Sequence, residues 1–405
     1  MSVIDSKSQA GLGRLHDAMA TRVAKGELPG MVTVVARGED VHVDTIGTLA
    51  FGSSEPMRRD TIFRITSMTK PILGLATMLL VDDGALALDE PVDRLLPELA
   101  NRKVLRRIDG PLDETVPARR RITVDDLLTF RMGHGLIMEP TFDPPFPIVN
   151  AAHDLQLVMG PPDPRTPLGP DEWMKRFATL PLMYQPGDRW QYNTGSLVLG
   201  VLVARASGQP LADFLRARIF EPLGMKDTGF SISAEQSRRL PSSYMTNFRT
   251  GKMEQTASGP TVWTTPPAFP SGAAGLVSTI DDYFAFAHLL LNGGMHRDKR
   301  LVSERSVRLM TANHLTPEQM ATGGPILGGQ GWGFLMAVAT APDEVSAVPG
   351  RYGWNGGYGT YWFNDPTRGL VAIAMTQVSD ALFNGTMTEF AKLAIDSEKQ
   401  GETKQ

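Results

Sequence analysis

Cysteine is absent from the 405 residues, and this absence excludes several kinds of chemistry. Without thiols the chain cannot form disulfides, build a thiolate zinc or iron–sulfur site, or use a cysteine nucleophile. Histidine is scarce, and the seven histidines are scattered singly with no H-E-x-x-H motif among them. Glycine loops of the phosphate-binding G-x-x-x-x-G-K-[ST] and G-x-G-x-x-G types are missing as well. The sequence therefore predicts neither a metal nor an organic cofactor.

Long apolar runs are also missing. The longest, from Ile72 to Val81, is about half of what a membrane span requires, and the N-terminus lacks the apolar core of a secretory signal. Lysine and arginine number 40 against 44 acidic residues, and this net charge of −4 gives no general attraction to nucleic acid or anionic lipid. We expect a cytoplasmic protein that binds neither nucleic acid nor membranes. Its oligomeric state is left open, and a homo-oligomer is one of the alternatives.

Strand-like runs gather at the two ends of the chain. Near the N-terminus, two β-branched runs are separated by Gly38-Glu39-Asp40, which predicts a hairpin. Near the C-terminus, residues 331–340, 359–365 and 369–378 form three more strand-like runs separated by turns. Helical patterns fill the rest, at 12–23, 124–130, 171–180, 195–208, 211–225, 281–294 and 387–395.

This distribution predicts an α+β fold with a split domain. Residues 1–86 and 271–398 would form a mostly antiparallel sheet flanked by the terminal helices, residues 87–270 an inserted helical lobe, and residues 399–405 a disordered tail. Proline-rich segments at 139–147 and 160–170 are long for plain connections and are typical of binding loops or lids. A small-molecule site is expected in the groove between the two lobes.

One catalytic pattern is present, Ser67-Met68-Thr69-Lys70, the only S-x-x-K in the chain. It follows an extended run and opens an apolar helix, and Pro71 is typical of a first helical turn. Residues three apart share a helix face, so the serine hydroxyl and the lysine amine can meet there. A desolvated lysine favours its neutral form and can accept a proton. Alternatively, Ser67 only caps the helix and Lys70 is solvated; the four residues alone do not decide between these.

Around this pattern the sequence resembles the serine β-lactamase and penicillin-binding protein superfamily, and it is most similar to class C β-lactamases and family VIII carboxylesterases. Residues 60–71 (DTIFRITSMTKP) resemble the nucleophile segment of that superfamily. Further resemblances follow in the expected order at 186–200 (PGDRWQYNTGSLVLG), 221–230 (EPLGMKDTGF), 272–294 (GAAGLVSTIDDYFAFAHLLLNGG) and 353–369 (GWNGGYGTYWFNDPTRG). The resemblance implies a β-lactamase/transpeptidase-like fold.

The resemblance also implies residue roles. Ser67 would be the nucleophile that becomes acylated, and Lys70 and Tyr192 would share the general-base and general-acid work, with the resting position of the proton left open. The oxyanion hole would consist of the backbone N–H groups of Ser67 and Gly357. No metal is implied.

Substrate-binding residues follow from the same segments and from the proline-rich loop. The candidates are Trp354, Asn355, Gly356, Asn193, Phe142 and Phe146. The two phenylalanines would line an apolar acyl or alcohol pocket if their loop covers the groove; otherwise they are local packing.

Two departures from the family pattern concern specificity. The tyrosine motif Y-x-N reads Tyr192-Asn193-Thr194, so threonine replaces the asparagine that would orient a substrate amide. Trp354 replaces the lysine or histidine that would face a substrate carboxylate, although Arg351 could partly substitute for that cation. Both changes favour esters over β-lactams.

We therefore expect a serine carboxylesterase that acts on a small-molecule ester through a Ser67 acyl-enzyme. The alternatives are a β-lactamase, amidase or acyltransferase on the same scaffold, or a penicillin-binding protein that deacylates slowly. A basic cluster at 102–107 and 119–121 is interpreted as a solvated face of the helical lobe rather than a nucleic-acid site.

Overall fold

The computed structural model describes residues 6–137, 145–157, 163–247, 249–256 and 260–397. Its helices are α1 (Ser6–Ala24), α2 (Thr69–Asp82), α3 (Val124–Leu128), α4 (Pro147–Asp154), α5 (Pro170–Thr179), α6 (Thr194–Ser207), α7 (Leu211–Leu215), α8 (Glu221–Leu223), α9 (Ile280–Leu291), α10 (Glu304–Met310), α11 (Pro317–Ala321), α12 (Gly324–Leu327) and α13 (Thr386–Asp396). No helix in these ranges combines the length and the hydrophobicity needed to cross a lipid bilayer.

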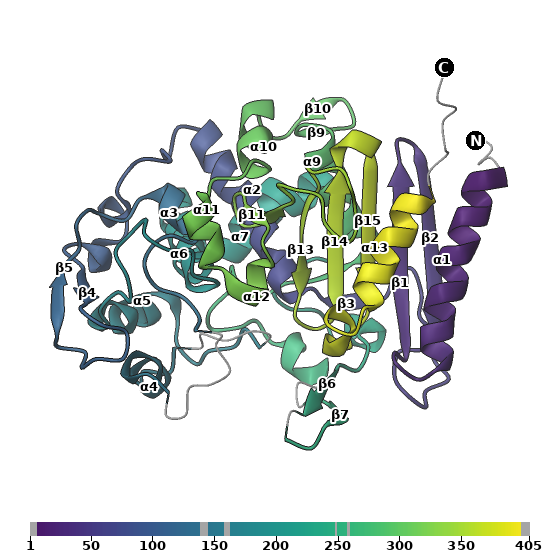
Figure 1. Ribbon diagram of the computed structural model, residues 1–405, viewed down its shortest axis with the longest axis horizontal. Helices are drawn as coiled ribbons and strands as arrows, with labels where there is room; N and C mark the ends of the chain where they lie inside the picture. The colour runs from purple at the N-terminus through teal and green to yellow at the C-terminus, as the bar shows by residue number, and fades with distance from the viewer. Residues whose placement is uncertain (1–5, 138–144, 158–162, 248, 257–259, 398–405) are drawn as a thin grey trace.

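A seven-stranded antiparallel sheet organises one half of the molecule (Figure 1). Its strands run in the order β11-β12-β13-β14-β15-β1-β2. Their bounds are β11 (Gly331–Trp332), β12 (Ala337–Val338), β13 (Tyr352–Gly356), β14 (Thr360–Asp365), β15 (Leu370–Met375), β1 (Gly30–Arg37) and β2 (Asp40–Gly47). The strands of this sheet thus come from both ends of the chain, and the α+β fold class is confirmed. The domain boundaries after residues 86 and 270 stay predictions.

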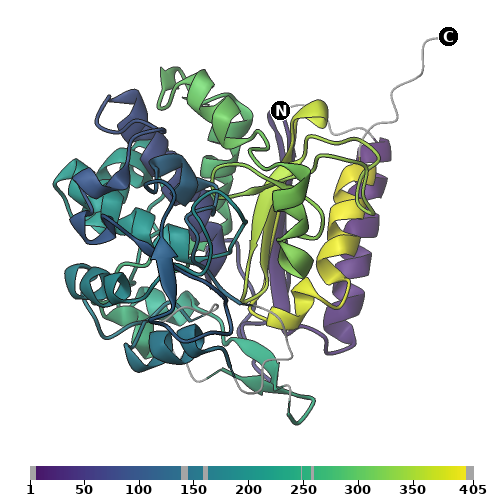
Figure 2. The same ribbon diagram turned by 60° about the vertical axis from the view of Figure 1, so that its left-hand side comes forward.

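Helices cover both faces of the sheet. On one face α1 and α13 pack side by side (Figure 2), and α9 packs on the opposite face against β14, β15 and β1. Strands covered on both faces need apolar side chains in both directions. This requirement explains why every residue of Leu370–Met375 is buried. The predicted hairpin is also confirmed, since Arg37 pairs with Asp40 across a two-residue turn.

Four small strand pairs lie outside this sheet. They are β3 (Ile62–Arg64) with β8 (Val277–Thr279), β4 (Lys103–Leu105) with β5 (Thr115–Pro117), β6 (Tyr244–Asn247) with β7 (Lys252–Gln255), and β9 (Met295–His296) with β10 (Lys299–Arg300). The pair β3–β8 holds the segment that precedes the predicted nucleophile, and Ile65 N–H continues the pairing by donating to Leu276 O at 3.1 Å.

The predicted strand at residues 331–340 is broken into β11 and β12. β11 and β12 pair with each other, and residues 333–336 form the turn between them, from which Phe334 N–H donates to Met310 O and Leu335 N–H to Leu128 O. Gly333 allows this because a Cβ there would clash with Met310 O. Tertiary hydrogen bonds at a glycine therefore override a continuous strand pattern.

The basic cluster differs in part from the prediction of a solvated face. Arg107, Arg119, Arg120 and Arg121 form ion pairs with nearby aspartates at the surface of the helical part. Arg102, in contrast, is buried and donates to main-chain carbonyls at the end of α5, so for this residue the prediction was wrong.

Candidate active site

Ser67 lies in a single 3₁₀ turn that joins β3 to α2. The preceding residue, Thr66, has a φ of 41°, a left-handed conformation that costs a non-glycine residue about 1–3 kcal/mol unless its surroundings hold it. The surroundings do so here. The Tyr283 hydroxyl donates to Met68 O at 3.1 Å, and Leu276 N–H donates to Thr69 Oγ1 at 3.1 Å. The turn that carries the predicted nucleophile is therefore fixed from α9 and from Leu276, directly before β8.

Lys70 meets Ser67 as the sequence spacing predicts. Its Nζ lies 2.9 Å from Ser67 Oγ and 2.7 Å from Ala273 O, and its side chain is fully buried. Burial lowers the pKa of Lys70 well below its ordinary value, and no acidic side chain in the described ranges opposes this shift. A neutral amine has two N–H groups and one lone pair. With one N–H on Ala273 O, the lone pair can accept the proton of Ser67.

Tyr192 completes the cluster from the start of α6. Lys70 Nζ lies 4.5 Å from the centre of its ring, and its hydroxyl is hydrogen-bonded to Ser67 and to Trp354 Nε1, the latter at 2.9 Å. Burial raises the pKa of Tyr192 to about 12, although both hydrogen bonds work against that shift. A lowered lysine pKa beside a raised tyrosine pKa favours the neutral pair over an ammonium–phenolate pair.

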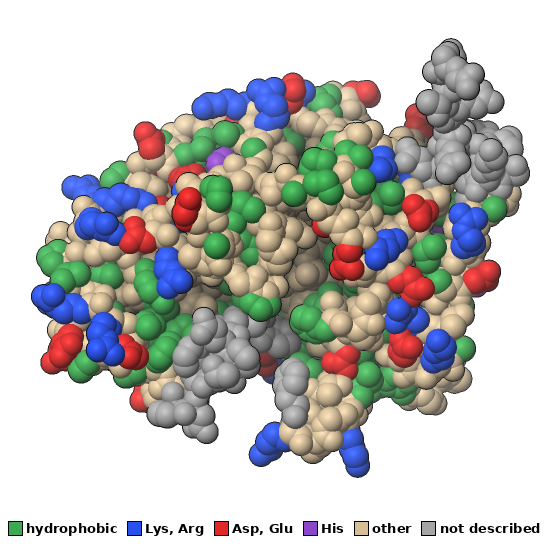
Figure 3. Space-filling model, viewed as in Figure 1, with side chains coloured by type: hydrophobic (Ala, Val, Ile, Leu, Met, Phe, Trp, Pro, Cys, Tyr) green, Lys and Arg blue, Asp and Glu red, His purple; other side chains and the backbone are tan. Residues whose placement is uncertain are grey.

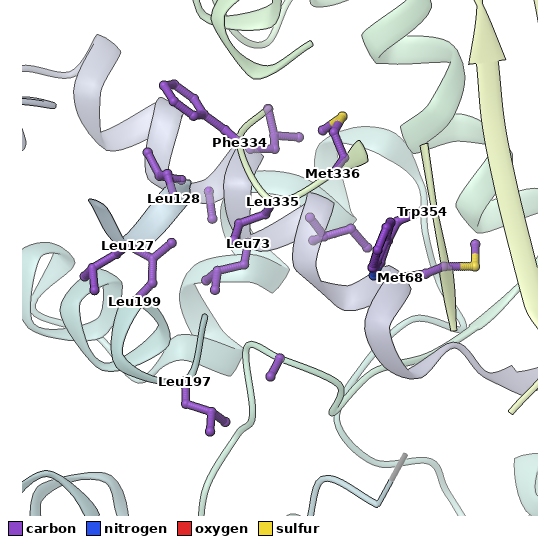
Figure 4. Packing of buried hydrophobic residues seen from close by; sticks show 14 of the residues in the cluster. Met68, Leu73, Leu127, Leu128, Leu197, Leu199, Phe334, Leu335, Met336 and Trp354 are labelled. Carbon is purple, nitrogen blue, oxygen red and sulfur yellow. The ribbon is translucent and has the colours of Figure 1, made fainter. Parts of the chain in front are cut away.

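Aromatic side chains from four segments surround the Tyr192 ring. The ring centres of Phe130, Trp190, Trp332 and Trp354 lie 5.6, 5.7, 6.5 and 5.6 Å from it. Figure 4 shows Trp354 beside Met68 of the nucleophile turn, within the cluster that also holds Leu73 of α2 and Leu335. This shell excludes water from Tyr192 and Lys70, which is the physical cause of both pKa shifts.

Strand β13 approaches the nucleophile turn very closely. A Cβ on Gly356 would clash with Ile65 O and lie 2.6 Å from Thr66 Oγ1, so only glycine fits. Thr360 Oγ1 also donates to Ile65 O, at 3.3 Å. Gly357 directly follows this contact in the sequence. The oxyanion hole of Ser67 and Gly357 stays a prediction.

Successive side chains of β13 point to opposite faces of the sheet. Trp354 faces Tyr192, so its neighbour Asn355 points to the other face, where its cross-strand partner Tyr361 packs against Phe390 of α13. Arg351 lies on that rear face as well; it is 6% exposed, stacks over Phe363 and is ion-paired with Asp343 at 2.5 Å. The suggestion that Arg351 replaces the missing cation was therefore wrong.

The other predicted pocket residues are mostly buried or remote. Phe142 lies outside the described residues. Phe146 precedes α4, a helix that the sequence analysis did not predict, and packs against the hydrophobic core. Asn193 is buried at the start of α6 with a φ of 80°, and Thr194 is completely buried. Trp354, predicted as a substrate-binding residue, is 6% exposed and donates a hydrogen bond to the Tyr192 hydroxyl.

Comparison with known proteins identifies the scaffold. A sequence model of the family described as Beta-lactamase matches residues 15–394. The chain belongs to the β-lactamase family. Protein Rv1367c of Mycobacterium tuberculosis is 40% identical over 91% of this chain and 89% of its own length. Esterase EstB of Burkholderia gladioli is 31% identical over 95% of this chain and 94% of its own.

Solved structures agree on the fold of this β-lactamase-family chain. EstCE1, described as a hydrolase with promiscuous acyltransferase activity, superposes with a TM-score of 0.80. The two chains are 23% identical, and the match covers 96% of this chain and 100% of the other. The predicted β-lactamase-like architecture is therefore confirmed.

A small cavity of about 140 Å³ adjoins Tyr192 in this β-lactamase-family site. Its lining is formed by Leu136, Ile137, Tyr184, Arg189, Trp190, Gln191, Tyr192 and residues 322–326. Sequence reasoning missed it, although Arg189 and Trp190 lie inside the recognised tyrosine segment. The wall at 322–326 leads into α12, which lies at the front of the molecule near the hollowed middle of the face in Figure 3.

Proposed function

We propose that this protein hydrolyses small carboxylic esters through an acyl-enzyme on Ser67. The observation that carries the proposal is the 2.9 Å contact between Ser67 Oγ and the Nζ of a fully buried Lys70 that has no acidic partner in the described ranges. Burial favours the neutral amine of such a lysine over its ammonium form, and a base in contact with a hydroxyl activates it as a nucleophile.

Acylation follows from the positions of these groups. Lys70 takes the proton of Ser67 as Oγ attacks the ester carbonyl carbon, and the oxyanion is stabilised by the N–H groups of Ser67 and Gly357. The acyl–oxygen bond of the ester then breaks. Tyr192, hydrogen-bonded to Ser67, donates its proton to the leaving alkoxide and regains one from Lys70. Trp354 keeps the Tyr192 hydroxyl oriented throughout.

Deacylation repeats the same steps with water. The lysine–tyrosine pair removes a proton from water, the hydroxide attacks the acyl carbon, and Ser67 regains its proton as the acid leaves. An alcohol in place of water would give acyl transfer by the same chemistry. Hydrolysis and transfer thus differ only in which nucleophile reaches the acyl-enzyme.

An ester preference is supported by two missing recognition groups. Thr194 is buried where an asparagine would bind a substrate amide, and Trp354 replaces a cation while Arg351 faces the rear of β13. A hydrogen bond to a charged group typically contributes about 1.5–3 kcal/mol, so its loss lowers β-lactam turnover by roughly one to two orders of magnitude. An apolar ester loses nothing by these changes.

Turnover of short-chain para-nitrophenyl esters and of nitrocefin tests the proposal. We expect kcat/KM for the ester to exceed that for nitrocefin by at least about tenfold, the lower end of the range that one lost charged hydrogen bond gives. Cephalosporin hydrolysis as fast as ester hydrolysis would contradict the preference. A burst of nitrophenol without steady turnover would instead indicate a slowly deacylating binding protein, and ester product formed from added alcohol would indicate acyl transfer.

A further inference from the structure

Among the residues that the structure describes, the lining of the cavity beside Tyr192 has one charged side chain and no acidic one. This lining contains Arg189 together with apolar, glycine, hydroxyl and amide residues. Two larger pockets contain several charged groups: one holds Arg102, Lys103, Arg120 and Arg121, and the other holds Arg351 with Asp343 and Glu344. The cavity beside Tyr192 therefore has a positive charge that no described residue of its lining neutralises.

The guanidinium of Arg189 is positioned but not paired. It stacks over the ring of Tyr184, with 4.5 Å between its central carbon and the ring centre. No carboxylate in the described ranges forms an ion pair with it. The neighbouring Asp188 is held instead by Arg119. Stacking leaves the edge of a guanidinium, with its N–H donors, free to bind a carboxylate.

The size and the walls of the cavity limit what fits. At about 30 Å³ per water-sized group, 140 Å³ accommodates roughly five non-hydrogen atoms. Leu136, Ile137 and Ile326 make much of the wall apolar, and Tyr192 forms one side. An aliphatic arm of two or three carbons ending in a carboxylate has this size and this distribution of polarity.

We propose that this cavity binds a short aliphatic arm of the substrate that ends in a carboxylate, with Arg189 as the residue that selects it. The inference rests on the proposed ester hydrolysis and names its substrate class. The substrates are half-esters of short dicarboxylic acids, or esters formed on the hydroxyl group of short hydroxy acids whose carboxylate stays free. The arm extends from the acyl side in the first case and from the alcohol side in the second. In either case it passes Tyr192, whose hydroxyl contacts Ser67.

Two matched pairs of esters test the inference and distinguish the two sides. Monomethyl succinate against methyl isocaproate places a carboxylate or an equally bulky isopropyl group on the acyl side. The acetate ester of β-hydroxypropanoate against isoamyl acetate makes the same comparison on the alcohol side. Hydrolysis is measured by the acid that it releases. We expect kcat/KM to be roughly ten- to hundredfold higher for the charged ester in one of the pairs, the usual range for a charged hydrogen bond.

Arg189→Gln should remove this preference, so that the charged and the neutral ester of each pair have similar kcat/KM values. Arg249→Gln, at an exposed arginine beside the β6–β7 hairpin, is the matched control and should keep the preference. High salt should weaken the preference of the wild-type enzyme because Arg189 is exposed. Equal rates within both pairs, or a preference that survives Arg189→Gln, would overturn the inference. If the wild-type enzyme hydrolysed none of the four esters, that result would contradict the proposed hydrolysis itself.

Discussion

Lys70→Met is expected to lower ester turnover by roughly 10²–10⁴-fold and at the same time to raise the free energy of unfolding at neutral pH. Methionine has a similar length and keeps the aliphatic contacts of a fully buried side chain. It also removes an amine that burial destabilises and that no acidic group compensates in the described ranges. Even where the buried charges were paired, replacing an ion pair by apolar groups of similar volume has stabilised proteins by about 1–4 kcal/mol.

The pH dependence of this stability difference has a defined sign. Because folding lowers the pKa of Lys70, the unfolded chain binds more protons at any pH between the folded value and 10.5. The free energy of unfolding of the wild-type protein therefore rises with pH through this window, and the advantage of Lys70→Met shrinks. Tyr192 acts in the opposite direction above pH 10, because its folded pKa is raised to about 12. Both proteins share that contribution, so it cancels in the comparison.

Urea unfolding of both proteins from pH 7 to pH 9.5, a range that lies below the ordinary tyrosine pKa of 10.0, measures this difference. Lys252→Met, at an exposed lysine of β7, is the matched control and should change neither activity nor stability appreciably. An inactive Lys70→Met variant that is less stable than the wild type at every pH would contradict the inference that burial destabilises the Lys70 amine. A variant that keeps its activity would exclude Lys70 as the base.

Tyr192→Phe should also slow acylation by roughly 10²–10⁴-fold, since the phenylalanine cannot protonate the leaving alkoxide. Because Tyr192 and Lys70 act on the same proton, Lys70→Met/Tyr192→Phe should be little slower than either single variant. Single-turnover release of para-nitrophenol measures this step. Tyr361→Phe, on the rear face of the sheet, serves as the control. Multiplicative losses in the double variant would show that the two residues act in separate steps.

Local features of the site could be predicted from the sequence. Ser67 and Lys70 lie three residues apart at a helix start, so their contact depends only on a local turn. The hairpin of β1 and β2 and the long helices follow from the same kind of local pattern. Tyr192 is 125 positions from Ser67 and was recognised only through the resemblance of its segment to a known family.

Other features depend on contacts that no local pattern contains. The Ala273 carbonyl that binds Lys70 and the bond between Trp354 and Tyr192 both join segments distant in sequence. The error over Arg351, in contrast, was avoidable. Residues three apart on a strand lie on opposite faces of the sheet, so once β13 is assigned as a strand Arg351 cannot share a face with Trp354.

The most direct test of the account is to identify the residue that becomes acylated. The protein is mixed with a para-nitrophenyl ester, quenched in acid during steady turnover, digested, and analysed by mass spectrometry. We predict that the acyl group is found on Ser67, and that Ser67→Ala carries no acyl group and has no turnover while its circular dichroism spectrum is unchanged. An acyl group on any other residue, or sustained turnover by Ser67→Ala, would contradict the central claim.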